Sequence, residues 1–155
     1  MRNNVDKFLG LFLALLMSLM VVNVLWQVIS RYILGSPSVF TDELATFMLI
    51  WVGLLGAAYA TGHKRHLAID ILPNQLEGDK KKLLGTVISV FVIVFAGAVM
   101  VIGGLRLVFL TLSLEQLSAT LRVPLGYIYF ALPLSGILII YYTLSNLKNI
   151  RHGIN

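Results

Sequence analysis

The sequence predicts an all-α membrane protein with four transmembrane helices. With 58% hydrophobic and 12% charged residues, the chain has too few polar side chains to cover a water-soluble globule of its size. Its apolar runs also reach the roughly 20 residues that a helix needs to cross a bilayer core. A length of 155 residues leaves room for about four such spans and short connections, and none for a soluble catalytic domain. We therefore expect one four-helix membrane domain over residues 1–155.

Small residues recur at helical spacing in the first two expected spans, over residues 8–33 and 42–60. In lipid, small residues four positions apart let helix backbones approach closely. We therefore expect these positions to form helix-packing surfaces. They are Gly10, Ala14 and Ser18 in the first span and Gly53, Gly56 and Ala57 in the second.

The other two spans are expected over residues 83–112 and 124–147. The third apolar helix is about 45 Å long at 1.5 Å per residue, which exceeds a membrane core of about 30 Å. We therefore expect a long third helix that tilts or protrudes from the membrane. Within the fourth span, Pro133 removes a backbone hydrogen bond and is followed by Gly136, so we expect a kink there.

The positive charges are distributed unequally between the two ends of the spans. Nine of the 12 lysine and arginine residues lie before the first span, between the second and third, or after the fourth. The remaining three are Arg31, Arg106 and Arg122. Because cytoplasmic loops are enriched in lysine and arginine, this asymmetry predicts that both termini are cytoplasmic (N-in/C-in).

A polar face interrupts the first apolar helix. Asn23, Gln27 and Arg31 recur four positions apart and so share one side of the helix. A short turn follows, and the second span then opens with the carboxylates of Asp42 and Glu43. We expect Arg31 to pair with one of these carboxylates near the outer interface, as a salt bridge that fixes the helical hairpin. One alternative is that this face contacts a partner subunit, a phospholipid headgroup or a docking protein, and another is that it forms a substrate or ion site within this chain.

The loop between the second and third spans offers one further pair. His66 and Asp70 lie four positions apart and would meet if that segment is helical, and we expect an interfacial structural role for them. All histidines of the chain, which are His63, His66 and His152, lie outside the spans. This placement argues against a membrane anchor that binds haem.

Residue types that carry catalysis or hold a cofactor are missing from the expected spans. No carboxylate lies in the middle of a span, where a self-sufficient proton-coupled exporter usually has one. The chain has no cysteine, no glycine-rich phosphate loop and no histidine or acid at metal-ligand spacing. We therefore predict no catalytic, cofactor-binding or metal site and no enzyme activity. Since the basic residues border apolar runs and form no patch with aromatics, we expect no nucleic-acid partner.

Several short segments of the chain carry a family pattern. They are Gln27-x-x-x-Arg31-Tyr32, the Phe40-Thr41-Asp42-Glu43 helix start, the Trp51–Ala60 run, His66-x-x-x-Asp70 and the proline-bearing stretch Leu121–Pro133. In these segments the sequence resembles the small membrane subunit of tripartite ATP-independent periplasmic (TRAP) transporters. Phe40 stands where many members carry tryptophan, which is a conservative difference.

The resemblance implies a role that the residues alone do not show. It implies a larger membrane subunit that carries the substrate and sodium sites, and a soluble periplasmic binding protein that delivers an organic acid. That acid would be sialic acid, another sugar acid or a C4-dicarboxylate. The small subunit would be a scaffold for an elevator-type movement in the bacterial inner membrane. The alternatives are a stand-alone small channel or transporter and an electron-transport membrane anchor.

Overall fold

The computed structural model describes residues 2–36, 38–63 and 79–151. In this part of the chain the regular elements are helices, and no strand forms beyond an isolated bridge between Leu117 and Pro124. The elements are α1 (Arg2–Tyr32), α2 (Val39–Gly62), α4 (Asp79–Phe95), the π-helix η1 (Ala96–Gly103), α5 (Gly104–Ser113), α6 (Leu125–Tyr129) and α7 (Ala131–Arg151).

Four helical stretches are long and apolar enough to cross a membrane, which confirms the predicted all-α fold class. They run over Asn4–Tyr32, Val39–Gly62, Leu83–Ser113 and Leu125–Leu147. The second stretch begins at Val39 and therefore earlier than the expected residue 42. Thr41 lies inside its first turn, where the hydroxyl donates to Ser38 O at 2.8 Å.

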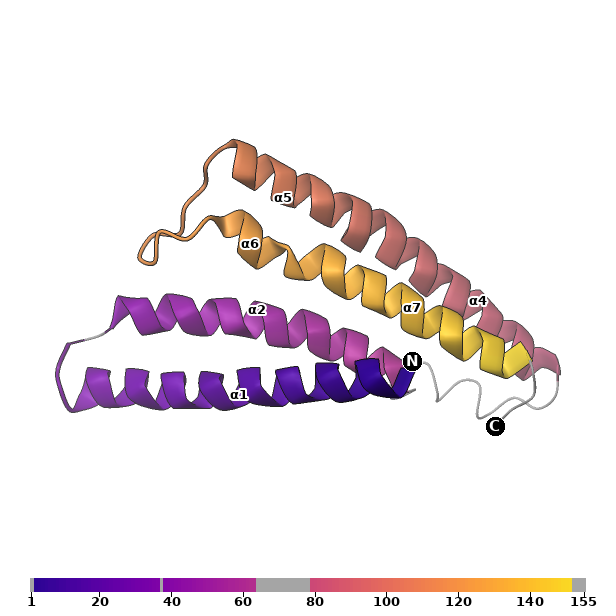
Figure 1. The fold of residues 1–155 in the computed structure, drawn as a ribbon, viewed down its shortest axis with the longest axis horizontal. Coiled ribbons are helices and arrows are strands. Elements are labelled where there is room, and N and C mark those ends of the chain that lie inside the picture. The colour runs from indigo at the N-terminus through magenta and orange to yellow at the C-terminus, as the bar shows by residue number, and fades with distance from the viewer. Residues whose placement is uncertain (1, 37, 64–78, 152–155) are drawn as a thin grey trace.

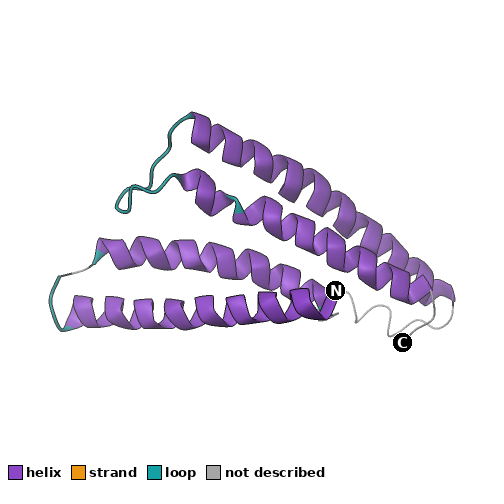
Figure 2. Cartoon of the chain, viewed as in Figure 1, coloured by secondary structure: helices purple, strands orange, loops and turns teal. Residues whose placement is uncertain are grey.

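The helices lie side by side in a row whose order differs from their order in the chain (Figure 1). α1 packs along α2, α2 packs along α7, and α7 packs along the long helix formed by α4, η1 and α5. The last span therefore stands between the second and the third. It is also the most enclosed span. In its most hydrophobic 18-residue segment 44% of the residues are buried, against 17% in the corresponding segment of each other span. Figure 2 shows that the described chain is dominated by these helices.

Two apolar clusters hold the row together. The cluster between α1, α2 and α7 contains the buried residues Leu9, Leu13, Leu55 and Tyr142. The cluster between α2, η1 and α7 contains Ala58, Ala96, Met100 and Ile139. Many other large apolar side chains are exposed, as expected for surfaces that face lipid or another membrane protein.

The long third helix contains a feature that the sequence analysis missed. Its middle, Ala96–Gly103, is a π-helix that joins α4 to α5 without a break. The apolar stretch of 31 residues from Leu83 to Ser113 measures about 46 Å at 1.5 Å per residue, which exceeds a membrane core of about 30 Å. The helix is inclined to α1 in Figure 1, and its length agrees with the expected long third span.

The fourth span is interrupted just before Pro133. α6 ends at Tyr129 and α7 begins at Ala131, so the regular helix is interrupted at Phe130, near the place where we expected a kink. The break falls where the proline nitrogen has no hydrogen to donate to the preceding turn. Glycines then let α7 approach the third helix closely, since a Cβ on Gly136 would lie 2.8 Å from Met100 Cβ. A Cβ on Gly104 would lie 2.9 Å from Pro133 Cδ.

The molecule consists of two helical hairpins that meet at one end and diverge at the other (Figure 1). The first hairpin is α1 with α2, and the second is the long third helix with α6 and α7. The N-terminus of α1 and the C-terminus of α7 lie at the converging end, which we call the terminal end. The α1–α2 turn and the loop 114–124 lie at the diverging end, which we call the loop end.

Candidate functional site

The polar face of α1 meets the first turn of α2 at the loop end. Asn23 Nδ2 donates to Thr41 O at 2.7 Å, and Gln27 Nε2 donates to Asp42 Oδ1 at 2.8 Å. Thr41 is buried, and the side chains of Asn23 and Gln27 are half-buried. Polar groups that lipid would penalise are thus satisfied within the chain.

Two further hydroxyl groups hold the turn between α1 and α2. Ser30 Oγ donates to Ser36 O at 2.7 Å, and Thr41 Oγ1 donates to Ser38 O at 2.8 Å. Ser30 and Thr41 are both buried. Gly35 has a φ of +64°, a left-handed conformation that glycine adopts without strain. These contacts fix the facing ends of the two helices at the turn.

The predicted salt bridge of Arg31 with Asp42 or Glu43 is wrong. Asp42 accepts a hydrogen bond from Gln27, and Glu43 accepts hydrogen bonds from a distant loop. Within the described chain neither carboxylate pairs with Arg31, whose side chain is exposed. The reason is geometric, because Gln27 lies one turn earlier in α1 and takes the place opposite Asp42 that we had assigned to the arginine.

Glu43 makes the contact with the largest sequence separation at the loop end. Its Oε1 accepts a hydrogen bond from the backbone N–H of Ala119 at 3.0 Å. Its Oε2 accepts from the N–H groups of Thr120 and Leu121 at 3.0 and 2.8 Å. Hydrogen bonds to a charged acceptor are about twice as strong as neutral ones. Because the carboxylate belongs to the first hairpin and the amides to the second, this contact joins the two hairpins.

The loop 114–124 also has internal hydrogen bonds. Ser118 N–H donates to Val123 O at 2.9 Å, and Val123 N–H donates back to Ser118 Oγ at 3.4 Å. Glu115 and Arg122 have φ values of 48° and 53°. Residues other than glycine adopt this left-handed region only where their surroundings hold them there. The backbone of the loop is therefore held in one conformation, and Arg122 is exposed on it.

A second polar cluster lies at the terminal end, around α7. Tyr142 is fully buried and donates its hydroxyl to Asp6 Oδ1 at 2.6 Å. Asn146 Nδ2 donates to Thr61 O at 3.1 Å. In the part of the chain that the structure describes, the buried Thr143 Oγ1 and Asn146 Oδ1 have no hydrogen-bond partner. The cluster joins α7 to both helices of the first hairpin.

The small residues predicted to form packing surfaces have different surroundings. A Cβ on Gly10 would lie 3.2 Å from Tyr59 Oη, so α1 and α2 approach closely there. A Cβ on Gly53 or Gly56 would meet nothing within 4 Å. The remaining positions are exposed, and they are Ala14, Ser18 and Ala57. Gly10 therefore packs closely within the chain. For the other positions, we still predict that they pack against another protein.

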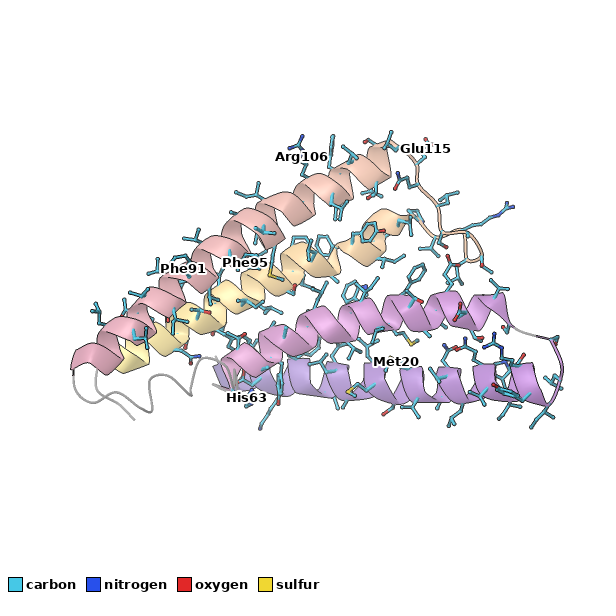
Figure 3. The ribbon with its side chains drawn as sticks, turned by 180° about the vertical axis from the view of Figure 1, so that it is seen from behind. Met20, His63, Phe91, Phe95, Arg106 and Glu115 are labelled. Carbon is cyan, nitrogen blue, oxygen red and sulfur yellow. The ribbon has the colours of Figure 1, made fainter. Side chains whose placement is uncertain are left out.

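The remaining predicted positions lie at the edges of the described chain or outside it. His66 and Asp70 lie outside the described residues. His63 lies at the terminal end, whereas Arg106 and Glu115 lie toward the loop end (Figure 3). No group of three histidine, cysteine, aspartate or glutamate side chains among the described residues could hold a metal ion.

Sequence reasoning missed the loop partners of Glu43 and the cluster around Tyr142. The amides that Glu43 binds are 76 to 78 residues away, and backbone groups give no signal in the sequence. The terminal cluster did leave a signal. Asn146 and Thr143 lie at the end of an apolar span, where polar side chains require partners.

Comparison with known proteins assigns the family. Residues 20–152 match the family of tripartite ATP-independent periplasmic transporters, DctQ component. The sialic acid TRAP transporter small permease protein SiaQ of Vibrio cholerae is 24% identical over 96% of this chain and 82% of its own length. The ectoine TRAP transporter small permease protein TeaB of Halomonas elongata is 32% identical over 56% of this chain and 45% of its own length. The C4-dicarboxylate TRAP transporter small permease protein DctQ of Rhodobacter capsulatus is 28% identical over 66% of this chain and 44% of its own length.

The family match covers most of the chain, including the polar face of α1, all of α2 and the loop that Glu43 binds. It agrees with the presence of four helices that are long and apolar enough to cross a membrane. It also replaces the alternatives of a stand-alone channel and an electron-transport anchor. The chain therefore belongs to the DctQ family and is a small permease subunit of a TRAP transporter, a transport component of the bacterial inner membrane and not an enzyme.

Proposed function

We propose that this subunit is the scaffold of a sodium-coupled secondary transporter that imports an organic acid. Its partners are a large membrane subunit, which carries the substrate and sodium sites, and a periplasmic binding protein, which delivers the acid. Residues 1–155 form one membrane domain with both termini in the cytoplasm. The terminal end of the helix row is then cytoplasmic, and the loop end is periplasmic.

The positions of the acidic residues carry the scaffold proposal. In the described spans, acids occur only near the ends, as Asp6 in α1 and as Asp42 and Glu43 in α2. Each of these carboxylates already accepts a hydrogen bond within the chain. Ion-coupled carriers bind their ions near the middle of the membrane, where polar groups are costly and functional. Since the described spans have no carboxylate there, the coupling site belongs to another subunit.

The names of the relatives support an organic acid as the substrate. They give sialic acid, ectoine and C4-dicarboxylate, and each of these compounds carries a carboxylate. For the transporter that contains this chain, we propose sialic acid, another sugar acid or a C4-dicarboxylate. Selectivity among these acids lies with the large subunit and the binding protein.

We assign separate tasks to the polar and the small residues of α1 and α2. The residues that hold the chain's own loop end are Asn23, Gln27, Asp42 and Glu43. The exposed Arg31 remains for a partner protein or a phospholipid headgroup. The positions left for close packing by the large subunit are Ala14, Ser18, Gly53, Gly56 and Ala57. His66 and Asp70 keep their predicted interfacial role.

Uptake by reconstituted vesicles tests this function. The small subunit, the large subunit and the binding protein are supplied singly and together, with labelled acids outside and an inward sodium gradient. We expect uptake only when all three proteins and the gradient are present. Uptake by this chain alone would contradict the scaffold role, and uptake by the three proteins without a sodium gradient would contradict sodium coupling.

Cysteine accessibility tests the proposed orientation. The chain has no cysteine, so single cysteines at Ser36, Ala119 and His63, all exposed, report their own positions. We expect those at Ser36 and Ala119 to react with an impermeant thiol reagent added outside the cell membrane. The one at His63 should react only after permeabilisation. The opposite pattern would place the termini in the periplasm.

A further inference from the structure

We propose that Glu43 is a positioning residue that sets the place of the loop 114–124 relative to α2. It acts through backbone amides of the loop, and it thereby fixes the separation of the two hairpins at the end where they diverge (Figure 1). This inference concerns the chain's own geometry and depends neither on the transported acid nor on sodium coupling.

The amides that face Glu43 form a site shaped for an anion. The N–H groups of Ala119, Thr120 and Leu121 converge on its carboxylate at N···O distances of 3.0, 3.0 and 2.8 Å. Consecutive N–H groups that converge in this way form an anion-binding concavity. Both carboxylate oxygens are used. A glutamine in this place would have one carbonyl oxygen and one NH₂ group, so it would present a donor to a donor.

The Ser118 side chain also hydrogen-bonds to the Glu43 carboxylate, whereas the other internal hydrogen bonds of the loop use other groups. Ser118 and Val123 bind each other, and Leu125 N–H donates to Gln116 O at 2.9 Å. Removal of the Glu43 carboxylate would therefore leave the three amides without their protein acceptor at the junction of the hairpins. Ala119 and Thr120 are exposed, so water can hydrate their amides once the carboxylate is gone, and the loop would no longer be held against α2.

Hydrogen bonds between the two hairpins occur at both ends of the row. At the terminal end, Asp6 binds Tyr142 and Thr61 binds Asn146, in a region where the helices already pack closely. At the loop end, α2 contacts α6 through few residues, whereas farther along it contacts α7 over a much longer stretch. In the described chain, Glu43 supplies the hydrogen bonds between the hairpins at this end.

Glu43 is itself held in a fixed place. The two residues before it, Thr41 and Asp42, accept hydrogen bonds from Asn23 and Gln27 of α1. The first turn of α2 is therefore attached to α1 on one side and to the loop on the other. Because its own helix is held against α1, the Glu43 carboxylate can hold the loop of the second hairpin at a fixed place relative to the first hairpin.

A distance measurement across the loop end tests the proposal. Two cysteines introduced at the exposed positions Ser36 and Ala119 carry a pair of spin labels, since the chain contains no other cysteine. The full-length chain is measured in lipid nanodiscs, alone and in complex with its large membrane subunit. With Glu43 present, we expect one narrow distance distribution. With Glu43→Gln, we expect a broader distribution shifted to longer distances.

Further variants separate the role of the charge from a general loss of structure. Glu43→Asp keeps the charge but shortens the side chain, so its distribution should lie between those of the native chain and Glu43→Gln. Glu115→Gln is the matched control in the same loop. Glu115 is exposed and its carboxylate accepts no hydrogen bond in the described chain, so the narrow distribution should remain. Glu43→Ala has no acceptor for the three amides, so its distribution should be as broad as that of Glu43→Gln, and added acetate should not narrow it because free acetate is not attached to α2.

An unchanged distribution in Glu43→Gln would overturn the proposal, and so would equal broadening in Glu115→Gln. Circular dichroism and gel filtration check folding. If Glu43→Gln does not fold, Glu43→Ala decides, and a narrow distribution like that of the native chain would reject the positioning role.

Uptake by the three-protein vesicles provides a second measurement. Glu43→Gln should lower uptake, and Glu43→Asp should restore part of it. Lost uptake with an unchanged distance would reject the positioning role in favour of a direct role in transport. A changed distance in a system where even the native complex shows no uptake would support the positioning role and reject only the proposed function.

Discussion

The terminal end and the loop end of the same helix row are held together in different ways. At the terminal end close packing dominates, because Tyr142 is fully buried and a Cβ on Gly62 would lie 2.8 Å from its ring. At the loop end hydrogen bonds dominate, from Asn23 and Gln27 to α2 and from Glu43 to the loop.

The difference shows two ways to specify helix pairing in a membrane. Lipid tails are as apolar as leucine, so apolar helices gain little free energy merely by meeting. A particular pairing must therefore come from a close fit of backbones and side chains or from directed hydrogen bonds. This chain combines a close fit with hydrogen bonds where its hairpins converge, and relies mainly on hydrogen bonds where they diverge.

The largest effect should follow from deleting the central side chain of the terminal end. Tyr142→Ala removes a fully buried ring and its hydrogen bond to Asp6, and such large-to-alanine changes cost about 3–5 kcal/mol. Tyr141→Ala is the control, since Tyr141 is 41% exposed, and it should cost much less. The measurement is the free energy of unfolding in mixed micelles. Equal losses in the two variants would refute a packed terminal end.

A smaller effect should follow from adding one methyl group. In Gly136→Ala the new Cβ would lie 2.8 Å from Met100 Cβ and 3.0 Å from Val101 Cγ2, and such overpacking costs about 1–3 kcal/mol. Gly53→Ala is the matched control, because nothing lies within 4 Å of its Cβ position. The isolated chain should tolerate it. If Gly53 packs against the large subunit, co-purification of the complex should weaken in this variant alone.

At the loop end a single hydrogen bond should contribute less. Asn23→Ala removes the donor to Thr41 O, and side-chain hydrogen bonds in membrane proteins average about 0.6 kcal/mol. Ser18→Ala is the comparison, because Ser18 is exposed and donates only to Ala14 O of its own helix at 2.8 Å. It should leave the unfolding free energy unchanged. If the two variants lose equal stability, hydrogen bonds between helices are not what holds the loop end.

The smallest effect should be a gain. Thr143 is buried and its hydroxyl has no partner in the described chain, and an unpaired buried polar group lowers stability. Thr143→Val should therefore stabilise the chain slightly. Thr111→Val is the opposite case, because the buried Thr111 hydroxyl donates to Leu107 O at 2.9 Å, and it should bring no gain. A loss in Thr143→Val would indicate that a water molecule satisfies the hydroxyl.

The spans could be predicted from the sequence because apolar length alone determines them. The break in the fourth span could also be predicted, because Pro133 lacks an N–H group whatever surrounds it. The polar face of α1 was recognised for the same local reason. Asn23 and Gln27 lie on one side of a helix, and a membrane requires that such groups find partners.

The rest depends on contacts that no local pattern encodes. We expected an opposite charge to bind Asp42, yet the neutral Gln27 lies nearer, and this choice depends on the helix register at the turn. Glu43 binds backbone amides, which every sequence has. The π-helical middle of the third span likewise has no residue that demands it, since Ala96–Gly103 contains the same small and apolar residues as its flanks.

The place of the last span in the row determines when the fold can be completed during synthesis. The chain enters the membrane from its N-terminus, so α1 and α2 can pair as soon as both are made. The third helix packs against α7 and α6, and both follow it in the chain. Until they arrive, the third helix lacks the two described helices along which it packs, and the loop that Glu43 binds is not yet held at its far end. A nascent chain that stops before α6 therefore contains the α1–α2 hairpin and a third helix without its packing partners, and the last span completes the row.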